Sequence, residues 1–391
     1  NKILSKLEEK EKLDVNASYE EWQKIIKNLP ESNQQIRFLR QYYNAYQFLK
    51  DTYDNDKIKV DAIKKATKSK LIHLYDKIIS RNPSWLLEEL KAKSESYKKL
   101  VNSEEDNALL QKALLDLSYV KAASAYTTLL LLKEYAKVNN DILIEIINVY
   151  IKFFIRRNVT DSPPTRDLDT IQVNISEAIF SMVKDKKQQE INGEWLYEQL
   201  KKYTNISSLT YFREKLHGKL YDENRDMTRF LLIKMEERGR TVEHKIDFWA
   251  RNNKGKYFWT IEHIFPQGKN IPTEWVKMIS NGNETKAKEI QEDCVHKLGN
   301  LTLSGYNSTL SNKDFYKKQG HEIVNEQGDK LKIGYRNNLN LNKLKFEHES
   351  TLYSLENTPK WNKDFIYART AKVVSEILEY FKFDDETNTN E

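Results

Sequence analysis

The sequence predicts a mainly α-helical fold, with a helical domain followed by a second helix-rich domain that contains a few short strands. Hydrophobic residues make up 39% of the 391 residues and charged residues 31%, a composition typical of a globular protein rich in amphipathic helices. Apolar residues recur at spacings of three and four through most of the first half, which is the period of an α-helix. Near Asn252 this pattern gives way to short runs typical of strands. The length alone predicts two or three domains.

The first half is predicted to be helical from residue 18 to about residue 157. Its first clear helix, YEEWQKIIKNL, places four apolar side chains on one face, namely Trp22, Ile25, Ile26 and Leu29. Residues 141–157 are apolar on most sides, which predicts a buried helix with Asp141 as its N-cap. Residues 160–169 contain two adjacent prolines, which cannot continue a helix, so a turn is predicted there.

Two strands are predicted in the second half. The first lies in residues 257–267, YFWTIEHIFPQ, where an aromatic and β-branched run ends at Pro266. The second lies in residues 296–308, HKLGNLTLSGYNS, where leucines alternate with small polar residues and two glycines act as breakers. A helical insertion around Trp275 separates them, and we expect the strands to pair as a hairpin despite it.

Two further helices are predicted after the second strand. One begins in STLSNKDFYKKQ, residues 308–319, and the other is the amphipathic segment at residues 366–381. The chain ends in an acidic tail, residues 384–391, that we expect to be mobile.

Composition excludes several classes of protein. With Cys294 as its single cysteine, the chain forms no intrachain disulfide and no cysteine-based zinc site. The pure leucine run at residues 129–132 is far too short to span a membrane, and no signal peptide is visible. We therefore expect an intracellular protein with no membrane partner. The net charge of +6 is too small an excess to establish nucleic-acid binding, because a solvated helical surface explains it equally well.

Five polar residues gather at the ends of the predicted strands: Glu262, His263, His296, Asn300 and Asn307. Carboxylate and amide oxygens are hard ligands suited to Mg²⁺ or Mn²⁺, and a neutral imidazole accepts a proton from water near pH 7. A metal beside a base is the equipment for attacking a phosphodiester. Taken singly, each residue has an ordinary structural explanation, with Asn300 as a turn residue and Asn307 as a helix cap.

The combination of these motifs is more specific than its parts. The segment TIEHIFPQ, followed by HKLGNLTLSGYNSTLSNKDFYKKQ, resembles the nuclease domain of GmrSD-type, modification-dependent (type IV) restriction endonucleases. That domain belongs to the HNH, or ββα-metal, nuclease superfamily. The resemblance extends over roughly residues 192–383 and includes WNKDFIYARTAKVV, which looks like the closing helix of the family. It implies that the second domain contains a ββα-metal (HNH) core.

The first half resembles the helical tail that follows the ParB-like nucleotidase domain of these proteins. The opening NKILSKL looks like the helix after that domain, whose own Asp-Gly-Gln-Gln-Arg motif does not occur here. Because the chain also begins without methionine, we expect a fragment that lacks the NTP-hydrolysing domain. The expected domains are a helical domain at 1–190, a nuclease domain at 191–383 and the acidic tail at 384–391.

The resemblance also implies roles for the clustered residues. His263 aligns with the general base, and Glu262 and Asn307 align with ligands of Mg²⁺ or Mn²⁺. Many relatives have Asp where this sequence has Glu262, so the longer side chain must place its oxygen from a different backbone position. Asn300 aligns with the residue that holds the loop carrying the base, and His296 is a candidate for phosphate contact or support of the site. Three lysines on the following helix are candidates for the DNA backbone or for a solvated face: Lys313, Lys317 and Lys318.

The expected function is a metal-dependent DNA endonuclease of a bacterial cytoplasm that acts in restriction of modified or phage DNA. The alternative is a non-catalytic DNA-binding or regulatory module that retains the ββα fold, and a weaker one is an RNA-cleaving HNH enzyme. The expected partners are DNA, modified or plain, and a nucleotidase domain or subunit. A homodimer is left open, and no motif selects one DNA modification.

Overall fold

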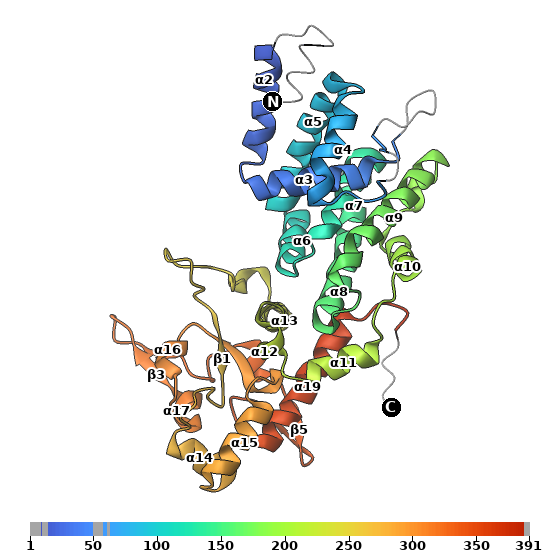
Figure 1. The fold of residues 1–391 in the computed structure, drawn as a ribbon. Coiled ribbons are helices and arrows are strands. Elements are labelled where there is room, and N and C mark those ends of the chain that lie inside the picture. The colour runs from blue at the N-terminus through green and yellow to red at the C-terminus, as the bar shows by residue number, and fades with distance from the viewer. Residues whose placement is uncertain (1–8, 10–14, 50–57, 61–62, 387–391) are drawn as a thin grey trace. The chain divides into compact units, whose positions relative to one another are not determined.

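The computed structural model describes residues 9, 15–49, 58–60 and 63–386, and these residues form two compact units (Figure 1). The first unit comprises residues 1–157 and 161–206, and the second comprises residues 158–160 and 207–391. The units therefore divide near residue 206, against the expected boundary at 190. The opening NKILSKL and the last five residues of the acidic tail lie outside the described part of the chain.

The first unit is helical, as predicted from its apolar spacing. Its α-helices are α2 (Val15–Asn28), α3 (Ser32–Tyr46), α4 (Leu71–Ile79), α5 (Pro83–Asn102), α6 (Ala108–Tyr119), α7 (Tyr126–Leu131), α8 (Asn140–Thr160), α9 (Thr165–Lys184) and α10 (Gly193–Tyr203). The predicted N-cap of α8 was wrong by two residues, because the Asn139 side chain accepts the Ile142 N–H at 2.9 Å and starts the helix there. The two prolines of the predicted turn lie between α8 and α9.

The second unit is a set of short helices with three two-stranded sheets. Its helices are α11 (Leu209–His217), α12 (Leu220–Glu223), α13 (Arg225–Glu237), α14 (Thr273–Ser280), α15 (Glu284–Cys294), α16 (Asn307–Leu310), α17 (Phe315–Gly320), α18 (Asn340–Lys343) and α19 (Lys363–Phe381). Its strands are β1 (Thr260–His263), β2 (Leu301–Ser304), β3 (Glu322–Val324), β4 (Lys330–Lys332), β5 (Phe346–His348) and β6 (Thr351–Tyr353), paired in chain order.

The expected hairpin is present despite the insertion within it. Strands β1 and β2 pair antiparallel, with Glu262 opposite Thr302 and His263 opposite Leu301. Helices α14 and α15 form the insertion between them. The helix predicted in residues 308–319 is instead two short helices, α16 and α17, which are interrupted at Ser311 with a φ of +37°.

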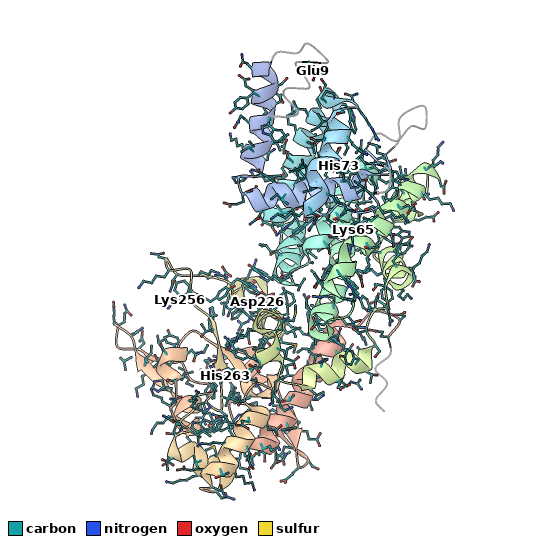
Figure 2. All side chains as sticks on the ribbon, in the orientation of Figure 1. Glu9, Lys65, His73, Asp226, Lys256 and His263 are labelled. Atoms are coloured by element: carbon teal, nitrogen blue, oxygen red, sulfur yellow. The ribbon has the colours of Figure 1, made fainter. Side chains whose placement is uncertain are left out.

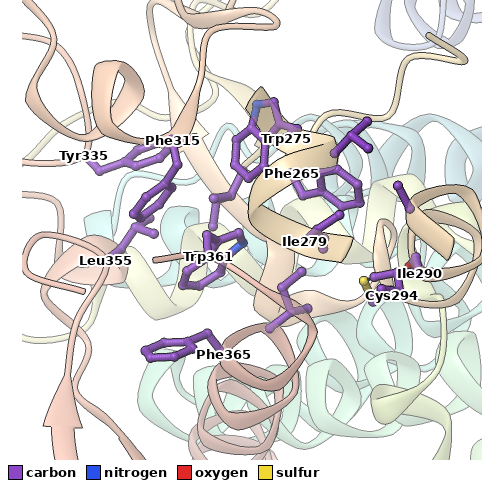
Figure 3. Packing of buried hydrophobic residues seen from close by; sticks show 14 of the residues in the cluster. Phe265, Trp275, Ile279, Ile290, Cys294, Phe315, Tyr335, Leu355, Trp361 and Phe365 are labelled. Atoms are coloured by element: carbon purple, nitrogen blue, oxygen red, sulfur yellow. Dashed lines mark hydrogen bonds between the residues drawn. The ribbon is translucent and has the colours of Figure 1, made fainter. Parts of the chain in front are cut away.

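The core of the second unit surrounds two fully buried tryptophans, Trp275 and Trp361 (Figure 3). The ring of Phe315 from α17 stacks on Trp361, with centroids 5.7 Å apart. Each indole also donates a hydrogen bond: Trp275 Nε1 to the Lys313 carbonyl at 2.9 Å, and Trp361 Nε1 to Asn300 Oδ1 at 3.1 Å. The core therefore fixes the segments on both sides of the hairpin. In the described part of the chain, no helix has the length and apolar composition needed to cross a bilayer.

Candidate active site

His263, labelled in Figure 2, ends strand β1 and faces a second histidine. Its Nε2 lies 3.2 Å from Nδ1 of His296, which follows α15. The ring of Tyr221 from α12 stacks on His296 with centroids 5.2 Å apart and meets His263 edge-on at 4.6 Å. Arg225 lies 5.0 Å from the centre of the Tyr221 ring. The two imidazoles are therefore held together by an aromatic side chain from a distant part of the sequence.

The surroundings of His263 favour a neutral imidazole. Burial lowers the pKa of His263 to about 3, and the nearby His296, Lys318 and Arg225 act in the same direction. The pKa of His296 is also lowered, mainly by burial, although Asp222 opposes the shift. The imidazole is therefore neutral at pH 7, which is the protonation state required of a general base, although a pKa of about 3 makes it a weak one.

Glu262 points away from His263, as neighbouring residues of a strand do. Its side chain is 2% exposed, and its Oε1 accepts a hydrogen bond from Lys318 Nζ at 2.7 Å. The Tyr335 hydroxyl donates to the same oxygen at 3.4 Å. Burial raises the pKa of Glu262 while Lys318 lowers it, and burial likewise lowers the pKa of Lys318. The result is a buried ion pair beside the histidine cluster.

Lys318 was a candidate for contact with the DNA backbone, but its side chain does not lie on the surface. It is fully buried, and it donates to the carbonyls of His263 at 2.9 Å and Ile264 at 3.2 Å as well as to Glu262. Its ammonium therefore holds the backbone at the end of β1 from the inside. Lys317 is exposed and pairs with Asp314 at 2.8 Å, and Lys313 donates to the Thr309 carbonyl at 2.6 Å.

Asn300 is fully buried and uses both ends of its amide. Its nitrogen donates to the carbonyls of Phe265 and Val295, each at 3.0 Å. Its oxygen accepts the Phe265 N–H at 2.8 Å and the Trp361 indole N–H at 3.1 Å. The side chain thus fixes the backbone two residues after His263.

Asn307 is the first residue of α16 and turns its side chain toward β1. Its amide nitrogen donates to Thr260 Oγ1 at 3.1 Å and to the Ile261 carbonyl at 2.8 Å. The side chain therefore ties α16 to the strand and does not cap the helix, whose N-cap is Tyr306.

The donor set for a metal ion consists of oxygens. Across the described residues, no group of three or more His, Cys, Asp and Glu side chains is placed to hold a metal. Within the same residues, Glu262 keeps one oxygen without a hydrogen bond, and Asn307 keeps its amide oxygen. Carboxylate and amide oxygens are donor types that Mg²⁺ prefers, although the carboxylate of Glu262 is buried and paired with Lys318.

Sequence reasoning missed several residues that shape the site. Tyr221 has no sequence signal, because it lies in a short helix about forty residues before His263. Arg369 of α19 is fully buried and donates to the carbonyls of Gly299 at 2.6 Å and Leu301 at 2.8 Å. Arg369 lies in the segment WNKDFIYARTAKVV, which resembles the closing helix of the family, but the sequence analysis assigned it no role in holding the hairpin.

Comparison with known proteins finds a family match for about half of the chain. Residues 185–375 match the family described as GmrSD restriction endonucleases, C-terminal domain. No curated protein matches the chain. No solved structure matches it either. The matched stretch contains both strands of the hairpin and all the clustered residues described above. Residues 185–375 are therefore similar to the C-terminal domain of GmrSD restriction endonucleases.

Proposed function

We propose that this protein is a metal-dependent DNA endonuclease that hydrolyses phosphodiester bonds by an HNH-type mechanism, in restriction of modified or phage DNA. The observation that carries the proposal is the contact of His263 with His296 at the end of an antiparallel hairpin, which is followed by the short helix α16. The family of residues 185–375 supports the same reaction class. DNA is the proposed substrate, and the helical first unit is proposed to connect to a nucleotidase domain or subunit.

In this proposal His263 takes a proton from the attacking water. Its Nε2 faces His296, so His296 is placed to orient the imidazole and to contact the phosphate. Asn300 and Lys318 keep the backbone of the base in place through bonds to Phe265 and to the His263 carbonyl. Mg²⁺ or Mn²⁺ held by Glu262 and Asn307 would stabilise charge on the phosphate and the leaving oxygen.

A second candidate is a non-catalytic DNA-binding or regulatory module, and the ion pair between Glu262 and Lys318 favours it. A carboxylate already neutralised by a buried ammonium is a weaker ligand for a divalent cation than a free one. This reading predicts DNA binding without metal-dependent cutting.

Plasmid cleavage with Mg²⁺ and with Mn²⁺ separates the two candidates. We expect wild-type protein to cut, and His263→Ala to lose at least about 100-fold in rate, because a positioned base contributes on that scale. Plain and hydroxymethylcytosine-containing DNA are compared, since the preferred substrate reports on modification sensing.

The matched control is His244→Ala, which removes an exposed histidine of the same unit and should cut as the wild type does. Melting temperatures verify that each variant is folded. Retained metal-dependent cleavage by folded His263→Ala would reject His263 as the base. Salt-dependent DNA binding by folded wild-type protein that never cuts would favour the binding module.

A further inference from the structure

A rigid basic hairpin leads directly into strand β1. Residues 250–258, here called the basic hairpin, contain three cations and no acidic residue: Arg251, Lys254 and Lys256. An antiparallel bridge joins Arg251 to Tyr257. The Phe258 N–H donates to the Ala250 carbonyl at 3.0 Å, and the Asn252 N–H donates to the Lys256 carbonyl at 2.8 Å. The two arms are therefore paired by the backbone.

The tip of the basic hairpin is a tight turn organised by Asn252. Its side-chain oxygen accepts the N–H groups of Lys254 at 2.9 Å and Lys256 at 3.0 Å. Gly255 donates to the Asn252 carbonyl at 2.8 Å and has a φ of +72°, a conformation that favours glycine. The turn thus has one defined shape, and it presents both lysines at the exposed end.

The base of the basic hairpin is anchored from inside the unit by Arg229 of α13. This buried guanidinium donates to the carbonyls of Phe248 at 3.0 Å and Trp259 at 2.5 Å, which flank the hairpin on both sides. It also lies 3.6 Å from the centre of the Tyr257 ring, and Arg251 lies 3.9 Å from the same centre. The hairpin is therefore held to the unit at both ends.

The two lysine side chains of the basic hairpin lack partners within the described part of the protein. The ammonium groups of Lys254 and Lys256 form no ion pair or hydrogen bond with any described residue. Phe258 is 56% exposed although it lies only two residues before β1. Free cations next to an exposed aromatic side chain are suited to a polyanion that also offers an apolar surface.

We propose that the basic hairpin is a contact surface for duplex DNA, with Lys254 and Lys256 on backbone phosphates and Phe258 against a groove. The proposal rests on the proposed function in taking DNA as the substrate. The hairpin continues into β1, the strand that ends at His263, so a DNA strand bound by the hairpin would run toward this strand; Figure 2 labels Lys256 and His263. It also supplies the cationic contact that the buried Lys318 does not provide.

The test measures binding of a fluorescein-labelled duplex to the whole chain in EDTA, over a series of NaCl concentrations. The variant Lys254→Gln/Lys256→Gln should bind more weakly, and its slope of log K against log salt should fall by about 1.8, since each phosphate contact contributes about 0.9. Phe258→Ser should weaken binding about tenfold, because the apolar contact of the ring with the groove is lost.

The matched control is Lys330→Gln/Lys332→Gln, which removes two exposed lysines from strand β4 of another hairpin in the same unit. Its salt slope should equal that of the wild type. Equal slopes for both double variants, or no duplex binding by folded wild-type protein, would overturn the proposal. DNA binding that depends on the basic hairpin, without any metal-dependent cleavage, would support the proposed contact surface and contradict the proposed nuclease function. Failure of one proposal can therefore be distinguished from failure of the other.

Discussion

At the scale of single residues, the ion pair between Glu262 and Lys318 is the feature with the largest expected effect on stability. Both side chains are almost fully buried, and Lys318 also satisfies two backbone carbonyls. Removing one partner of a buried pair leaves an uncompensated charge, which typically costs about 3–5 kcal/mol. Replacing both partners removes that charge imbalance.

We therefore expect Lys318→Met to lower the free energy of unfolding by about 3–5 kcal/mol at pH 8, measured by urea unfolding. The double variant Glu262→Gln/Lys318→Met should recover much of the loss. The matched control is Lys317→Met, which removes the exposed neighbouring lysine and should change stability little. If both single variants were equally stable, Lys318 would not be a buried partner of Glu262.

The sequence was sufficient to find the residues of the candidate site but not all of their contacts. Glu262, His263, Asn300 and Asn307 stood out because they follow apolar strands at a recognisable spacing. The buried position of Lys318 was not predictable, since its partner lies 56 residues away and the neighbouring Lys317 has the same local signal. Burial of one lysine among many is decided by tertiary packing, which no local pattern reports.

At the scale of secondary-structure elements, the approach of α19 to the turn before β2 explains why position 299 is a glycine. A Cβ on Gly299 would lie 2.2 Å from the Ile366 carbonyl oxygen and 2.5 Å from the Thr370 backbone nitrogen. The Gly299 N–H also donates to Thr370 Oγ1 at 3.1 Å, so the two backbones are in direct contact. Helix α19 thereby supports the strand opposite β1.

Gly299→Ala is expected to destabilise the second unit by about 1–3 kcal/mol, because extra volume forces the backbones apart. Urea unfolding followed by tryptophan fluorescence measures the change. Gly320→Ala is the control, since an added Cβ there meets no atom within 4 Å. A Gly299→Ala protein as stable as the control would show that α19 does not press on the turn.

The pairing of strands could be predicted where apolar runs in the sequence marked the two strands. The hairpin of β1 and β2 followed from two short apolar runs, and the insertion did not hide it. The single helix predicted in residues 308–319 was wrong, because the chain turns at Ser311 in a positive-φ conformation that serine does not signal. Such a break depends on the packing of Phe315 against Trp361, which is a tertiary contact.

At the scale of the whole molecule, the helical pattern continues across the division of the chain into two units. Residues 193–203 form α10 of the first unit, and residues 209–217 form α11 of the second. The short segment TNISS, residues 204–208, separates the two helices, and the units divide at this loop. Each unit has its own buried core, so each is expected to unfold in its own cooperative transition.

The pH dependence of the second transition should report the state of His263. Burial holds the pKa of His263 at about 3, below the usual 6.5, so above pH 6.5 the histidine is neutral in both states and affects stability little. As the pH falls from 6.5 toward 3, the unfolded chain takes up the proton first, and stability is lost.

Between pH 7 and pH 5 the loss from His263 should be on the order of 2 kcal/mol. Calorimetry of wild type and His263→Gln measures this loss as the difference in stability between the two proteins. The raised pKa of Glu262 has the opposite effect on stability, and this contribution cancels because both proteins contain Glu262. On acidification, His263→Gln should lose less stability than the wild type. The difference should appear only in the unfolding transition of the second unit. His73→Gln, an exposed position of the first unit, is the control and should match the wild type at every pH. Parallel curves for wild type and His263→Gln down to pH 5 would mean that burial does not lower the pKa of His263.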